Sequence, residues 1–131
     1  MNEREFQRRT KTLALQAIRL TDLLPKTATA DVLFRQLLRS ATSVGANYRA
    51  ACRARSSADM INKLRIVEEE ADESIYWMEL LAESGVIPLA CLSDLMKQAD
   101  EIVAMTVASI KTLRGNSQIA NPKSAIVTRR P

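Results

Sequence analysis

The 131-residue chain contains no histidine, and it has few glycines, prolines and aromatic residues. Without histidine it lacks the commonest general base, the usual partner of a serine or cysteine nucleophile, and a ligand found in most zinc and di-iron sites. The scarcity of helix breakers and aromatic residues, together with much alanine and leucine, favours long helices over strands. We therefore predict a helical protein that is not an enzyme and binds no metal or other cofactor.

The sequence also lacks a long apolar run and a dense set of cysteines. Residues 1–11 include six charged side chains, whereas a signal peptide needs an apolar stretch after its basic start. No run approaches the roughly 18 apolar residues that a membrane-spanning helix needs. Cys52 and Cys91 stand apart in apolar surroundings, as free thiols of a reducing compartment do. We expect a cytoplasmic protein without membrane contact.

Apolar residues recur at alternating steps of three and four positions, the spacing that keeps one face of a helix against a partner. The pattern predicts four helices, over residues 3–24, 30–55, 57–84 and 88–114. Short connections make consecutive helices antiparallel, so we predict an all-α, antiparallel up-down-up-down four-helix bundle over residues 1–115. Residues 116–131 lack this periodicity and are predicted to form a flexible basic tail.

Capping and helix-breaking residues set these boundaries. Pro25 is expected to end the first helix, Gly85 the third and Gly115 the fourth. Thr29 is the predicted N-cap of the second helix and Ser56 that of the third.

Charge divides the predicted bundle into two halves. Residues 1–55 hold eleven Lys/Arg and four Asp/Glu, whereas residues 56–115 hold five and eleven. The three cations of the predicted tail therefore account for most of the net charge of +4. Opposed halves suit a head-to-tail contact in which the basic side of one subunit meets the acidic side of the next, and such contacts close into rings.

The second predicted helix carries a stripe of cations. At about 100° per residue, four arginines fall within about 80° of one another. They are Arg35, Arg39, Arg49 and Arg53. The stripe is either an ordinary solvated face or a surface for the phosphates of RNA or DNA.

The third predicted helix has a second face beside its core stripe, formed by Ile66, Glu70, Glu73, Trp77 and Leu80. The only tryptophan, Trp77, is typical either of the edge of a core or of a subunit contact. Glu70 and Glu73 have the spacing of a di-iron motif without its histidine, so a salt bridge to arginine is the better interpretation. We predict that these five residues lie at an oligomer interface.

Two stretches resemble a known family, the four-helix bundles called 23S rRNA-intervening sequence proteins. The first runs from Gln36 to Ala51, and the second from Ser56 to Leu81, with Lys63-Leu64, Glu69-Glu70, Glu73-Ser74 and Tyr76-Trp77 in matching order. The resemblance covers about residues 6–113. One departure is Ala50, where the resemblance leads us to expect glutamate.

The resemblance implies a left-handed up-down bundle that assembles as a homopentamer. It also implies kinship with the accessory variability proteins of diversity-generating retroelements, which are pentamers whose basic surfaces bind nucleic acid and a reverse transcriptase. It supplies no catalytic residue, and no agreed biochemical function.

Two functions are compatible with the sequence. The first is a non-enzymatic, ring-forming scaffold that binds RNA or DNA weakly through backbone phosphates at the arginine stripe. The second is a pure protein-interaction module, which binds itself, a reverse transcriptase or another protein. In that case the four arginines pair with acidic residues of the neighbouring subunit or of a partner protein.

Overall fold

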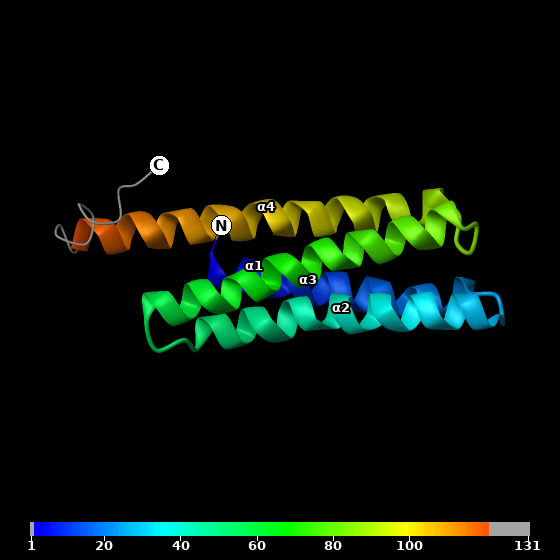
Figure 1. Ribbon diagram of the computed structural model, residues 1–131, viewed down its shortest axis with the longest axis horizontal. Coiled ribbons are helices and arrows are strands. Elements are labelled where there is room, and N and C mark those ends of the chain that lie inside the picture. The colour runs from blue at the N-terminus through cyan, green and yellow to red at the C-terminus, as the bar shows by residue number, and fades with distance from the viewer. Residues whose placement is uncertain (1, 121–131) are drawn as a thin grey trace.

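The computed structural model describes residues 2–120, with side chains described for residues 2–116. This part of the chain forms α1 (Glu3–Arg19), the 3-10 helix η1 (Leu20–Leu23), α2 (Ala28–Cys52), α3 (Ser57–Glu83) and α4 (Leu89–Ala120). Consecutive helices run in opposite directions and lie side by side along the long axis (Figure 1). The predicted all-α four-helix bundle is confirmed.

Three of the helices have an N-cap residue whose side chain accepts a hydrogen bond from the first turn. The Asn2 side chain accepts a hydrogen bond from the Glu5 N–H at 2.8 Å, and the Ser56 hydroxyl accepts one from the Asp59 N–H at 3.1 Å. The N-cap of α2 is Thr27, whose hydroxyl accepts from the Ala30 N–H at 3.2 Å. The prediction of Thr29 as this cap is therefore wrong, because α2 begins one residue after Thr27.

Two helices end earlier than predicted. The α-helical part of α1 ends at Arg19, since Leu24 is extended before Pro25 and the intervening residues tighten into η1. α2 ends at Cys52 rather than at residue 55, because Ser56 must itself be extended to cap α3.

The last helix ends later than predicted. α4 continues through Gly115 to Ala120, so the predicted start of the tail at residue 116 is wrong. Among the described residues only Gly85 has a positive φ, of 77°, and Gly115 keeps a φ that any helical residue adopts. A lone glycine in a helix costs only about 1 kcal/mol relative to alanine, which is too little to stop it. Residues 121–131 lie outside the described residues.

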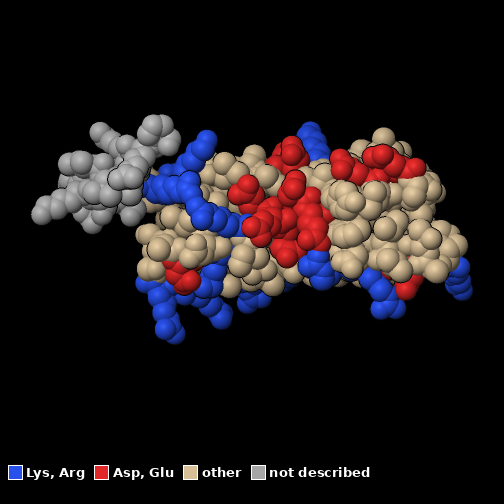
Figure 2. Space-filling model, in the orientation of Figure 1, with Lys and Arg blue, Asp and Glu red and all other residues tan. Residues whose placement is uncertain are grey.

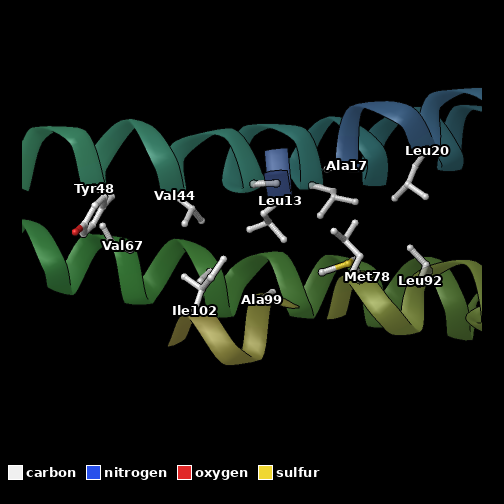
Figure 3. Close-up of a cluster of buried hydrophobic side chains, with 14 of the residues drawn as sticks. Leu13, Ala17, Leu20, Val44, Tyr48, Val67, Met78, Leu92, Ala99 and Ile102 are labelled. Atoms are coloured by element: carbon white, nitrogen blue, oxygen red, sulfur yellow. The ribbon is translucent and has the colours of Figure 1, made fainter. Parts of the chain in front are cut away.

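The core fills the space between the α1/α2 pair and the α3/α4 pair. Apolar side chains from all four helices point toward one another there (Figure 3). Leu13, Leu37, Leu64 and Met78 are completely buried. Four small hydroxyl residues are also buried, and each has a hydrogen-bond partner: for example, Ser74 donates to Ser40 at 2.9 Å. The predicted apolar periodicity therefore describes the interior of a single bundle.

Candidate nucleic-acid interface

The structure divides the predicted arginine stripe of α2 into two parts. All four side chains are exposed, but two have acidic partners in the same chain. The Nε of Arg35 lies 2.9 Å from the Oδ2 of Asp31. The guanidinium of Arg39 reaches across to α3, where it pairs with Glu70 at 3.3 Å and also with Glu73. These two arginines are thus partly neutralised, unlike Arg49 and Arg53.

Arg49 and Arg53 form one wall of a groove between α1 and α2, the α1/α2 groove. Its volume is about 810 Å³, and Arg4, Arg8 and Lys11 of α1 supply the opposite wall. Its other lining residues are uncharged: Gln7, Thr10, Ala14, Thr42, Gly45, Ala46 and Cys52. Five cations therefore face one hollow that has no acidic lining residue.

Helical spacing explains why these cations converge. Arg4, Arg8 and Lys11 follow one another at steps of four and three, so they share one face of α1. Arg49 and Arg53 are four residues apart on α2. The sequence prediction did not include the three α1 cations in the candidate site. Their steps of four and three residues were the signal that could have identified them.

Acidic residues approach the groove at two points, and one of them is Glu3, whose carboxylate lies beside the Cys52 thiol in the groove wall. Arg8 lies 3.5 Å from Glu5, in an exposed pair that contributes little. Among the described residues, Arg4, Lys11, Arg49 and Arg53 have no ion-pair partner within 4.0 Å. This concentration of like charge favours an anionic ligand.

Small side chains form the floor of the groove and bring its walls together. A Cβ placed on Gly45 would lie 3.3 Å from the Oγ1 of buried Thr10 on α1. Ala14 and Ala46 also line the groove, and neither adds bulk. The absence of a side chain at Gly45 therefore permits the close approach of α1 and α2.

A buried aromatic pair lies beside Cys52, one of the residues that line the groove. Phe6 of α1 stacks on Tyr48 of α2 with ring centroids 3.9 Å apart and planes 4° apart. Burial raises the pKa of the Tyr48 phenol above its usual range. Burial likewise raises the pKa of the adjacent Cys52 thiol, which accepts a hydrogen bond from Gln7 at 3.8 Å. Both groups are therefore neutral near pH 7.

A second cationic hollow lies on the other side of α2, and we name it the α2/α3 hollow. Its volume is about 500 Å³, and its lining residues are Ala46, Arg49, Ala50, Arg53 and Lys63. Lys63 of α3 lies 2.7 Å from the Oδ1 of Asp59, and this hydrogen bond lowers the pKa of Asp59. Ala50 adds no carboxylate to this hollow.

The five residues predicted as an oligomer interface lie on α3 beside α2. Ile66 is 40% exposed, whereas Glu70, Glu73, Trp77 and Leu80 are half-buried. The Trp77 indole N–H donates to Glu73 at 2.9 Å.

The neighbouring Tyr76, which the sequence interpretation missed, is 52% exposed with its ring edge-on to Trp77. The face thus combines exposed apolar surface with carboxylates that Arg39 of the same chain already contacts.

The surface keeps the charge separation expected from the sequence. In Figure 2, acidic side chains gather over the middle of the face formed by α3 and α4, while basic side chains follow the edge formed by α2. No helix within residues 2–120 is long and apolar enough to cross a membrane. In the same part of the chain, no three His, Cys, Asp or Glu side chains gather where they could hold a metal ion.

Comparison with known proteins gives a consistent picture. A family model described as 23S rRNA-intervening sequence protein matches residues 2–108. A solved structure from Bacteroides thetaiotaomicron VPI-5482, described as a protein with unknown function from the S23 ribosomal protein family, is 35% identical with a TM-score of 0.75. The similarity covers 81% of this chain and 98% of that one. No curated protein matches.

Proposed function

Because the chain belongs to the 23S rRNA-intervening sequence protein family and concentrates five cations in one groove, we propose that it is a non-enzymatic scaffold that binds RNA or DNA through backbone phosphates. The single observation that carries this proposal is the α1/α2 groove, with cations on both walls and no acidic lining residue. Phosphates are the polyanionic ligand that such a surface binds, with little dependence on base sequence.

The proposed contact with nucleic acid includes only part of the arginine stripe that the sequence predicts. Arg49 and Arg53 stay in it, joined by Arg4, Arg8 and Lys11 from α1. Arg35 and Arg39 make smaller contributions, because acidic neighbours already hold them.

The test is filter binding of a labelled RNA to the full chain at several salt concentrations. Replacing Arg49 and Arg53 together by glutamine should weaken binding at least about tenfold and lower the slope of log affinity against log salt by about two. The matched control replaces Lys97 and Lys111, two exposed cations of α4, by glutamine. Equal losses in the two double variants would assign binding to overall charge and refute the proposal.

A second candidate function, self-assembly, is favoured by a separate observation. Ile66 and Tyr76 leave apolar surface exposed on α3 beside the half-buried Trp77. Trp and Tyr are enriched in subunit contacts. A ring of identical chains, of the five-membered kind that the family resemblance implies, would cover this face.

A further inference from the structure

The α1/α2 groove and the α2/α3 hollow share a common wall. Ala46, Arg49 and Arg53 line both of them. The two arginines therefore form a ridge along α2, with a cationic hollow on either side. Lys11 and its neighbours face the ridge from α1, and Lys63, whose ammonium already lies 2.7 Å from the Oδ1 of Asp59, faces it from α3.

Neither hollow offers a platform on which a base could stack. No aromatic residue lines either one. The nearby rings of Phe6 and Tyr48 are buried against each other, and Trp77 contacts Glu73 on a different part of α3. Proteins that bind single strands combine a cationic track with exposed aromatic side chains. These hollows have only the cationic part, so they favour a ligand whose bases are already paired.

The arrangement of the hollows, one on each side of a single row of cations, suits a ligand with two phosphate backbones. The side chains of Arg49 and Arg53 separate the two hollows, because both hollows include these residues in their lining. The major groove of B-form DNA is about 12 Å wide, and A-form RNA presents a wide minor groove. Ala46 and Ala50 keep the flanks of the ridge low, so a backbone can approach on either side.

We propose that the preferred ligand is a duplex that straddles α2. The ridge of Arg49 and Arg53 faces a groove of the duplex, one backbone lies in the α1/α2 groove, and the other lies in the α2/α3 hollow. The inference rests on the proposed nucleic-acid function and adds the strandedness of the ligand. A single strand occupies only the α1/α2 groove.

The experiment compares three labelled probes of equal strand length by fluorescence anisotropy: duplex RNA, duplex DNA and an unstructured single-stranded RNA. The full chain should bind a duplex at least about tenfold more tightly than the single strand, because a second backbone adds phosphate contacts. The two duplex arms decide between A-form and B-form ligands.

Ala50 allows a matched pair of variants, because it lines only the α2/α3 hollow. Ala50→Glu puts a carboxylate beside Lys63 and Arg53. It should weaken duplex binding about tenfold and single-strand binding clearly less, because Arg53 is the only one of these two cations that also lines the α1/α2 groove. Ala50→Gln, of the same size without the charge, should bind both probes like the parent. If Ala50→Glu lowers the helical circular dichroism signal, Lys63→Gln is the substitute variant. It should weaken binding of the duplex probes and leave binding of the single strand unchanged.

Two different experimental results would overturn the straddling arrangement and the proposed function. Equal affinity for duplex and single strand, or equal losses in both arms for the charged variant, overturns the straddling arrangement and leaves the proposed function intact. An absence of salt-dependent binding to all three probes overturns the proposed function itself.

Discussion

Cys52 is a natural reporter of the α1/α2 groove, because its half-buried thiol lies in the groove wall. Burial raises its pKa above the usual 9.0, so less of it is thiolate at a given pH. Cys91 on α4 is exposed. We predict that iodoacetamide at pH 8 alkylates Cys52 more slowly than Cys91, and that the Cys52 rate still rises with pH beyond 9.0. Peptide mass spectrometry over time measures both rates.

Bound nucleic acid should slow this reaction at one thiol only. A saturating duplex covers the α1/α2 groove and should protect Cys52, while the rate at Cys91 stays unchanged as the internal control. Equal rates at Cys52 with and without the duplex would contradict the placement of the ligand.

Among the elements, the α3–α4 connection depends on one backbone conformation. Gly85 has a φ of 77°, and its N–H bonds to the Ala82 carbonyl at 3.1 Å. The next two residues both bond to the Leu81 carbonyl, which brings Ile87 into the core. This turn is an α-helix end that favours glycine.

We predict that Gly85→Ala lowers the free energy of unfolding by about 1 kcal/mol, because a Cβ strains this conformation. Gly115→Ala is the matched control: it makes the same chemical change inside α4, where no atom lies within 4 Å of the new Cβ. It should leave stability unchanged or raise it by up to about 1 kcal/mol. Urea denaturation followed by circular dichroism measures both variants, and equal losses would contradict the role of the turn.

Gly85 and Gly115 differ in whether the surrounding structure requires the helix to end. The sequence predicted both glycines as helix ends, since glycine suits either an end or a permissive interior position. Gly85 ends α3 because the chain must reverse before buried Ile87, whereas Gly115 meets no such requirement.

At the scale of the whole molecule, separated charge and an exposed apolar face on α3 both favour assembly. Size exclusion with light scattering should therefore give a mass that is a multiple of the 14.6 kDa chain, fivefold if the implied pentamer forms. Ile66→Asp should shift the mass toward that of one chain, because it places a charge in the proposed contact. Leu15→Asp on α1, where exposure is 44% against 40% for Ile66, is the matched control and should leave the mass unchanged.

A single-chain mass for the parent protein at micromolar concentration would contradict self-assembly. Dissociation by both variants alike would instead indicate that any exposed apolar position contributes, and would remove the assignment to α3.

The sequence by itself determined the number of helices, the faces that form the core, and the division into a basic and an acidic half. These properties are local, because the 3.6-residue period and the side chain's own charge are fixed by the residues of one helix. The same period also put Glu70, Glu73 and Trp77 together on one side of α3, where they lie.

Only the tertiary structure decided which charges share a surface. The helical period fixes the direction in which a side chain points from the helix axis. It does not determine which neighbouring helix that side chain contacts. Packing of α1 against α2 through Thr10 and Gly45 joined two sets of cations into one groove, while contact with α3 occupied Arg39. The candidate interface therefore follows from helix pairing, which depends on burial across the whole bundle.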